Sequence, residues 1–232
     1  MRGLKANGVV VDIGGNIGDT ALLLHLLNPS ARIASIEPVP ETYFYMLWNL
    51  EANRVPLLSI SRFQNPALPG VHPISAGVSA DGRNITFLIA PGWSKKAKDA
   101  ALAKNWHHAN KRGYSQNVTV ATIRASRLMN VLKLPVTLRL AMLKIDCEGC
   151  EREAMTELAD VIKHSNRLAG EIHGHIPHAI RGKQGMPIQK NITDTSTRGC
   201  GATWERCSRE ELFHKLCYGH AANTMFECGV PL

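Results

Sequence analysis

Long hydrophobic runs are missing from this 232-residue sequence. No apolar stretch approaches the roughly 18 residues that a membrane-spanning helix needs, so we do not expect a transmembrane protein. A secretory signal is missing as well, because the first predicted strand begins at Val9. The sequence therefore predicts a soluble protein, cytoplasmic by default. The secretory pathway stays open as an alternative if the chain is part of a longer precursor.

Closely spaced cysteines are scarce: of the six, only Cys147 and Cys150 form a C-x-x-C pair. A structural zinc site normally needs a second close pair or histidines at defined spacing, and neither is evident, so we predict no metal. We interpret Cys147 and Cys150 as packing residues near a functional site. In an exported protein the other four could form disulfides: Cys200, Cys207, Cys217 and Cys228.

Acidic residues are scarce in one stretch of the chain. The net charge is +8, and residues 91–140 carry ten basic side chains against one acidic, while the remainder is nearly balanced. Because the excess is confined to one segment, there is no strong signal for nucleic-acid binding. The basic insertion at about 91–116 leaves two interpretations open. It is a solvated loop and helix, or a lid that meets an anionic substrate, a membrane surface or a polyanion.

Apolar β-branched runs alternate with amphipathic segments in the first quarter of the chain. Residues 9–13 and 32–37 are typical of buried strands, and residues 19–28 and 40–53 of helices, the second opened by Pro40. Short links in this β-α-β-α order predict parallel strands joined by right-handed crossovers. We therefore predict an α/β fold: a Rossmann-like, doubly wound, mostly parallel sheet with helices on both faces.

The same patterns continue, less regularly, along the rest of the chain. We expect further strands at 72–79, 84–90, 117–123, 140–146 and 167–176, and helices at 124–133, 151–165 and 208–220. There is no internal repeat or strong boundary. Residues 1–232 are therefore predicted to form one domain, with the basic insertion and a loop-rich C-terminal part at about 177–232.

Polar residues follow four of the predicted strands at the point where each ends. They are Asp12 with a glycine-rich loop, Glu37, Asp146 with Glu148, and Glu171 followed by His173. In an open α/β sheet, ligands bind outside the carboxyl ends of the strands, so these side chains should converge on one site. Alternation along the strand places Glu171, His173 and His175 on one face.

The loop after the first strand, residues 14–18, reads GGNIG. Glycines let the backbone turn sharply and approach a ligand without a Cβ in the way. Glu37, about 20 residues along, can accept hydrogen bonds from both hydroxyls of a ribose. The glycine spacing differs from the dinucleotide pattern G-x-G-x-x-G. Asp12 would repel a pyrophosphate but suits a cationic sulfonium, so the loop favours S-adenosyl-L-methionine over NAD.

Three blocks, DIGGNIGD, IEPVPETY with NLEAN, and LKIDCEGCE, resemble in order and spacing the FkbM family of Rossmann-like S-adenosylmethionine-dependent methyltransferases. The resemblance implies that Glu37 holds the ribose and Pro38 packs near the adenine. It also implies that Asp146 lies beside the methyl donor and the acceptor. Together with the glycine loop it completes the predicted cofactor-binding set: Asp12, Gly14, Gly15, Asn16, Gly18, Glu37 and Pro38.

The leading functional hypothesis is O-methylation of a hydroxyl on a small molecule, a sugar or a protein side chain. If the basic insertion contacts this acceptor, we expect the acceptor to be anionic. Asp146 and His173 are the candidate general bases, and Glu148 and Glu171 are their orienting partners. Asp146 has a second interpretation, as the N-cap of the helix at 151–165. Two other functions stay open: a NAD(P)-dependent oxidoreductase, and a catalytically silent module that binds a polyanion through residues 93–114.

Overall fold

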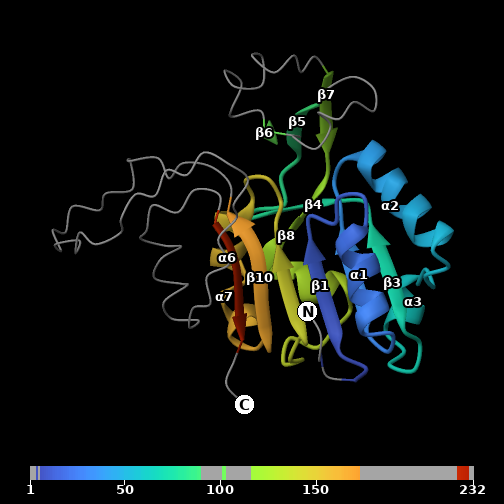
Figure 1. Cartoon of the computed structure of the whole chain (residues 1–232). Helices are drawn as coiled ribbons and strands as arrows, with labels where there is room; N and C mark the ends of the chain where they lie inside the picture. The colour runs from blue at the N-terminus through green and yellow to red at the C-terminus, as the bar shows by residue number, and fades with distance from the viewer. Residues whose placement is uncertain (1–3, 5, 90–100, 103–115, 173–223, 230–232) are drawn as a thin grey trace, which may run out of the picture.

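The computed structural model describes residues 4, 6–89, 101–102, 116–172 and 224–229, and its centre is a six-stranded sheet (Figure 1). The strand order is β11-β10-β9-β1-β2-β3. All neighbours pair in parallel except β10 and β11, which are antiparallel. The strands are β1 (Val9–Ile13), β2 (Arg32–Ile36), β3 (Gly70–Ile74), β9 (Met142–Ile145), β10 (Arg167–Ile172) and β11 (Thr224–Gly229). This order and sense are those of a Rossmann-like α/β fold.

The central strand β1 is buried along its whole length. Val9, Val11 and Ile13 belong to one hydrophobic cluster, whereas Val10 belongs to a second cluster. Successive side chains of a strand point to opposite faces, so the run VVVDI supplies apolar contacts to both faces at once. This explains why the run is continuously apolar up to Asp12.

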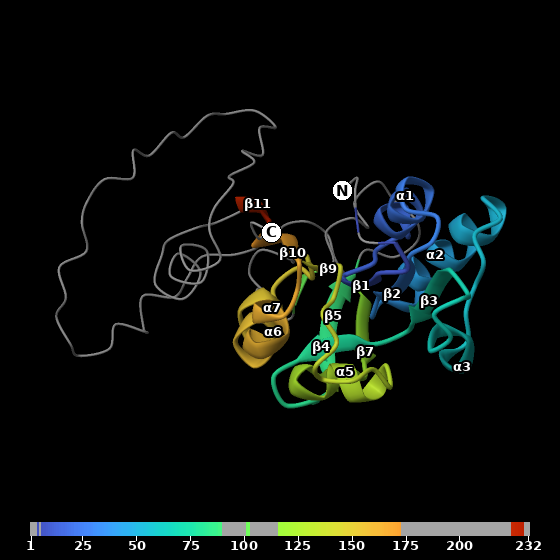
Figure 2. The same ribbon diagram turned by 90° about the horizontal axis from the view of Figure 1, so that it is seen from below.

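Helices cover both faces of the sheet, as Figure 2 shows most clearly. On one face lie α1 (Asp19–Leu27) and α2 (Pro40–Ala52), whose inward residues include Leu24 and Leu50. On the other face lie α5 (Leu128–Val131), α6 (Glu151–Glu157) and α7 (Ala159–Lys163), after a 3-10 turn at Ala125–Arg127. A short helix, α3 (Ile60–Phe63), precedes β3. Within the described ranges, no helix is long and apolar enough to span a membrane.

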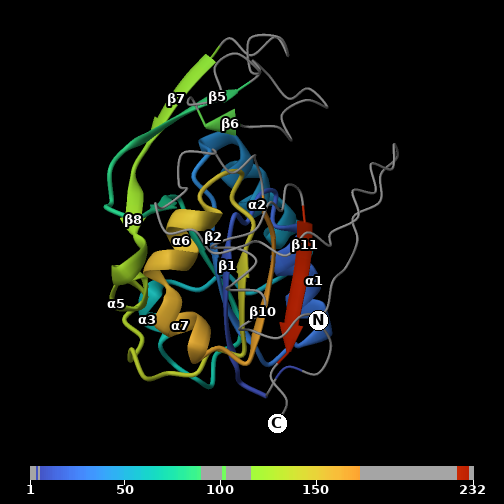
Figure 3. The same ribbon diagram turned by 90° about the vertical axis from the view of Figure 1, so that its left-hand side faces the viewer.

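Two small sheets complete the described structure. β4 (Gly77–Ser79) pairs in parallel with β8 (Thr122–Arg124). β5 (Ile85–Ile89) pairs in antiparallel fashion with β6 (Ala101–Leu102) and β7 (Gln116–Val120). Figures 1 and 3 show β5 and β7 extending beyond the edge of the main sheet at which β1, β9 and β10 end. The basic insertion therefore connects two strands that lie above this edge.

The predicted fold class is confirmed. Two predicted strands differ from the observed ones, because each is divided between two sheets. The strand expected at 72–79 is two strands, because β3 ends at Ile74 and β4 joins a different sheet. The strand expected at 117–123 divides in the same way, between β7 and β8. Periodicity along the chain does not reveal such a change of partner. The helix expected at 151–165 is interrupted at Leu158, and the one expected at 208–220 lies outside the described residues.

Candidate functional site

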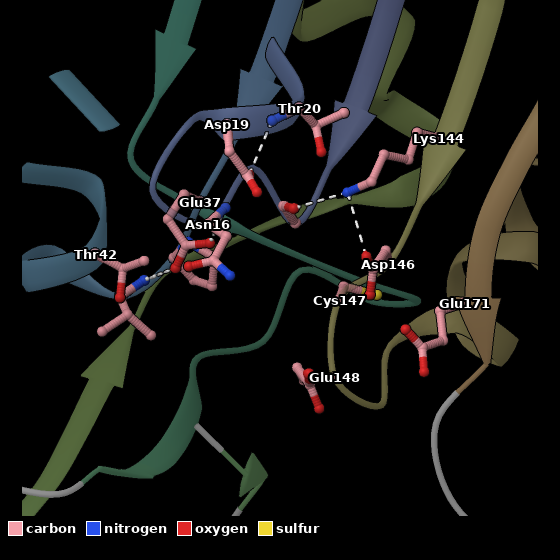
Figure 4. A pocket seen from close by; sticks show the side chains of 13 residues that line it. Asn16, Asp19, Thr20, Glu37, Thr42, Lys144, Asp146, Cys147, Glu148 and Glu171 are labelled. Atoms are coloured by element: carbon pink, nitrogen blue, oxygen red, sulfur yellow. Dashed lines mark hydrogen bonds and ion pairs between the residues drawn. The ribbon is translucent and has the colours of Figure 1, made fainter. Parts of the chain in front are cut away.

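A cavity of about 300 Å³ opens at the carboxyl ends of β1, β2, β9 and β10 (Figure 4). Its volume is at the lower end of the range for small-molecule sites. The described residues that line it are Gly14, Asn16, Asp19, Thr20, Glu37, Pro38, Val39, Thr42, Lys144, Asp146, Cys147, Glu148 and Glu171. The structure therefore brings residues from all four predicted strand ends to one pocket.

The glycine loop turns back over the end of β2. Backbone N–H groups of Gly14 and Gly15 both donate to the carbonyl of Ile36, each at 2.9 Å. Gly14 and Gly18 have φ of +86° and +82°, which side-chain-bearing residues rarely adopt. A Cβ at Gly14 would lie 1.7 Å from the carbonyl oxygen of Asp146, and one at Gly15 would lie 2.3 Å from Ser35 Oγ.

These contacts give the glycines a packing role beside the predicted one. The sequence predicts room for a ligand, and the structure adds close packing of the loop against the protein itself. Of the three glycines, Gly14 lines the pocket, and Gly15 and Gly18 are not among its described lining residues. Gly18 is instead packed against Met46 of α2.

Glu37 lies at the end of β2 with only 6% of its surface exposed. Its carboxylate accepts hydrogen bonds from the backbone N–H of Asn16 at 2.9 Å and of Val39 at 2.8 Å. Burial raises the pKa of Glu37 to about 7, against the lowering effect of the two N–H groups. The side chain is thus fixed in position, and it changes from protonated to ionised near neutral pH. Pro38 and Val39 continue the same wall of the pocket.

Asp12 is fully buried and contacts Lys144, which lines the pocket. One carboxylate oxygen accepts from Ser35 Oγ at 2.8 Å, and the other is 3.0 Å from Lys144 Nζ. The carboxylate thus meets two protein partners and is not among the described lining groups. This differs from the expectation that Asp12 faces a cationic ligand, because Lys144 already balances its charge.

Lys144 lines the pocket, and the sequence did not predict it as a site residue. Its ammonium is 3.0 Å from Asp12, 3.5 Å from Asp146 Oδ2 and 3.1 Å from the carbonyl oxygen of Gly14, to which it donates. Burial lowers the pKa of Lys144, but the carboxylates of Asp12 and Asp146 outweigh that effect and leave the pKa above its ordinary value. The available signal was a lysine inside the buried strand LAMLKID, two positions before an aspartate.

Three predicted catalytic carboxylates, Asp146, Glu148 and Glu171, line the pocket across from Glu37 (Figure 4). The N-cap interpretation of Asp146 is wrong, because Cys150 is the N-cap residue of α6 and no side chain caps that helix. Glu148 has a φ of +56°, so the loop after β9 turns sharply at this residue. His173, the fourth predicted catalytic residue, lies outside the described residues, as does His175.

The loop between β9 and α6 is closed by a disulfide between Cys147 and Cys150. We expected both cysteines to be packing residues. Cys150 is indeed buried in a hydrophobic cluster, and Cys147 lines the pocket, but the structure adds a covalent bond. Glu151 supports the loop by accepting hydrogen bonds from the backbone N–H groups of Cys147 and Gly149.

Among the described residues, no group of His, Cys, Asp or Glu side chains could hold a metal ion.

Reducing the Cys147–Cys150 disulfide should lower the free energy of unfolding by about 2 kcal/mol, the value that loop-closure entropy gives for so short a loop. The measurement is urea denaturation of the wild type with and without a dithiol reductant. The C147A/C150A variant is the control, because its unfolding midpoint should not respond to the reductant. Equal midpoints for the oxidised and reduced wild type would contradict the expectation.

The methyltransferase FkbM domain model matches residues 12–181 of the chain. Methyltransferase sdnD of Sordaria araneosa is 25% identical over 173 residues, which are 67% of this chain and 62% of the relative. The chain therefore spans less than two thirds of that relative's length.

Two solved structures are similar to parts of the chain. One is methyltransferase FkbM from Methylobacillus flagellatus KT, with a TM-score of 0.41 and 14% identity over 72% of this chain and 33% of that one. The other is precorrin-6y C5,15-methyltransferase from Geobacter metallireducens GS-15, with a TM-score of 0.36 and 12% identity over 74% of this chain and 56% of that one. The family model covers well over half of the sequence, and the chain therefore belongs to the methyltransferase FkbM domain family.

Proposed function

We propose that this protein is an S-adenosyl-L-methionine-dependent methyltransferase that methylates a hydroxyl on a small molecule or a sugar. One observation carries the proposal: two acidic groups lie on opposite sides of one pocket. Glu37, held by two backbone N–H groups, lies at one side, and Asp146 lies at the other (Figure 4). A nucleoside-recognising carboxylate and a candidate base are thus separated by the space that a methyl donor would occupy.

The lining residues fit this donor. Each oxygen of Glu37 accepts one N–H, and an ionised carboxylate has further acceptor sites that two ribose hydroxyls can use. Pro38 and Val39, beside Glu37, would give the adenine an apolar wall. Gly14 and Asn16 of the glycine loop would hold the methionine end. When bound, S-adenosyl-L-methionine supplies an electrophilic methyl group on a positively charged sulfur.

The chain's own residues would then hold and deprotonate the acceptor. Asp146 accepts the proton of the attacking hydroxyl, and Glu148 and Glu171 orient that hydroxyl. Holding two reactants in line contributes roughly 7–11 kcal/mol to lowering a barrier of this kind. His173 remains a candidate base on the sequence argument alone.

The charge of the pocket bears on the acceptor. The described lining includes five acidic residues and one lysine, and the lysine is paired with Asp12 and Asp146. Such a lining favours a neutral or cationic acceptor, because an anion would meet like charges. The interpretation of an anionic acceptor rests on the basic insertion at about 91–116, most of which lies outside the described residues.

Calorimetric titration with S-adenosyl-L-methionine and, separately, with NAD(P)H tests the cofactor. Incubation with a donor carrying a labelled methyl group, and with a panel of sugars and hydroxylated small molecules, tests the reaction. Saturable binding of the donor and a labelled methyl ether in the product support the proposal. Heat with NAD(P)H but none with S-adenosyl-L-methionine would overturn it, and label on nitrogen or carbon would overturn the O-methyl assignment.

A further inference from the structure

We propose that Lys144 is a positioning residue, whose ammonium joins the glycine loop to Asp146 and fixes the donor half of the pocket against the catalytic half. The inference rests on the proposed function, in which Asp146 is the base. It assigns a role to a residue that would not itself touch the reacting atoms.

The position of Lys144 follows from the register of the central strands. Asp12 of β1 is paired with Ser35 of β2 on one side and with Lys144 of β9 on the other. Paired residues of neighbouring strands point to the same face, so the three side chains form a polar row across the sheet. All three are buried, at 0%, 0% and 8% exposure for Asp12, Ser35 and Lys144. The pairing register of the strands therefore places Asp12 within reach of both partners, Ser35 for the hydrogen bond and Lys144 for the ion pair.

Such a row is not needed to hold the sheet together. Removing two charges from water costs free energy that their attraction only partly offsets, and well-packed apolar residues are often as stabilising or more so. The preceding pair on the same face, Val10 of β1 and Met142 of β9, shows that buried apolar side chains fill this face of the sheet. A charged row in the centre of the sheet therefore calls for a role beyond packing.

The contacts of the ammonium indicate what that role is. An ammonium has three N–H donors, and Lys144 has three oxygen neighbours: Asp12, Asp146 and the carbonyl of Gly14. Two of these neighbours line the pocket, one on the glycine loop and one at the end of β9. The backbone carbonyl of Asp146 also packs directly against Gly14. The backbones of Gly14 and Asp146 are thus in contact, and the side chain of Lys144 links the same two residues.

The rival interpretation is that Lys144 merely neutralises Asp12. The pair of variants D12N and D12N/K144M separates the two, because neither carries the buried charge of Asp12. If neutralisation were the whole role, deleting the lysine in the D12N background would change little. If Lys144 positions Asp146, kcat at saturating donor and acceptor should fall by about 10- to 100-fold from D12N to D12N/K144M. The dissociation constant of S-adenosyl-L-methionine should change by less than about threefold, because Glu37 is untouched and the N–H groups of Gly14 and Gly15 still hold the loop on the carbonyl of Ile36.

The K163M variant is the matched control for a lysine-to-methionine change, since Lys163 is exposed on α7, outside the described pocket lining. Should D12N/K144M not fold, K144Q in the wild-type background keeps a donor for Asp12, and kcat is compared with wild type by the same criterion. A kcat within threefold of the reference would overturn the inference. A wild type that neither binds the donor nor transfers a methyl group would instead refute the proposed function.

Discussion

Replacing Asp146 with asparagine is expected to lower the rate of methyl transfer about 100- to 10,000-fold, the usual contribution of a positioned general base. Asparagine has nearly the same shape and can still contact Lys144, but it cannot take the proton of the acceptor hydroxyl. The dissociation constant of the methyl donor should change far less than kcat. The measurement is a single-turnover rate with labelled S-adenosyl-L-methionine at saturating acceptor.

Asp160 offers a matched control for this change. It is a highly exposed aspartate on α7, where it pairs with Lys163, and it is not among the described lining residues of the pocket. D160N should transfer the methyl group at the wild-type rate. If D146N were as fast as D160N, Asp146 would not be the base, and His173 would become the leading candidate.

The second large effect is expected at Glu37, where the E37Q change should weaken binding of S-adenosyl-L-methionine by roughly 10- to 100-fold. Hydrogen bonds to a charged partner contribute about 1.5–3 kcal/mol, and glutamine offers a neutral acceptor on one atom only. Calorimetric titration measures the dissociation constant directly. E51Q is the control, since Glu51 is an exposed residue of α2 that is not among the described lining residues. Equal affinity in both variants would exclude ribose recognition by Glu37.

The same residue predicts a pH dependence of donor binding. The carboxylate is the stronger acceptor, and the pKa of Glu37 is raised to about 7 by burial. Affinity for the donor should therefore increase as pH rises through about 7 and level off above it. In E37Q this component should vanish. An affinity that is constant from pH 6 to pH 8 in the wild type would contradict the assignment.

Stability without the donor should follow the opposite course. An acid whose pKa is higher in the folded than in the unfolded state stabilises the fold below its unfolded pKa, and that contribution is lost as pH rises through the folded pKa. For Glu37, with an ordinary value of 4.5 and a folded value of about 7, the loss is roughly 3 kcal/mol between these limits. The difference in unfolding free energy between wild type and E37Q, measured from pH 4 to pH 8, isolates this contribution. The proposed function thus uses a group that is held at some cost in stability.

The sequence was sufficient to predict the sheet because its central strands carry a local signal. A short run such as VVVDI is apolar on both faces, and only a strand covered by helices on both sides accommodates it. The convergence of Glu37, Asp146 and Glu171 followed from the same reasoning, since parallel strands end at one edge. The contacts that each side chain makes at this edge were harder to predict. Asp12 was assigned to a ligand because no local pattern shows that a lysine on a strand over a hundred positions away lies beside it.

The disulfide and the divided strands were missed for a related reason. C-x-x-C spacing is compatible with packing, metal binding or a covalent bond, and only the backbone path of Cys147 to Cys150 decides among them. Pairing partners likewise depend on long-range geometry, so the split of 72–79 into β3 and β4 had no sequence signature. The sequence predicts a sharp glycine turn after β1, and the structure adds a packing reason for Gly14, because a Cβ there would lie 1.7 Å from the carbonyl oxygen of Asp146.

The pairing of Lys144 with Asp12 and Gly14 has a consequence for the order in which the molecule can assemble. One part of the pocket lining is encoded by residues 14–42 and the other by residues 144–171. During synthesis residues 14–42 leave the ribosome before β9 exists, and until then Lys144 cannot pair with the carboxylate of Asp12. Any compact state that lacks β9 must therefore keep Asp12 hydrated or protonated. The ion pair between Asp12 and Lys144 requires β9 to be paired with β1.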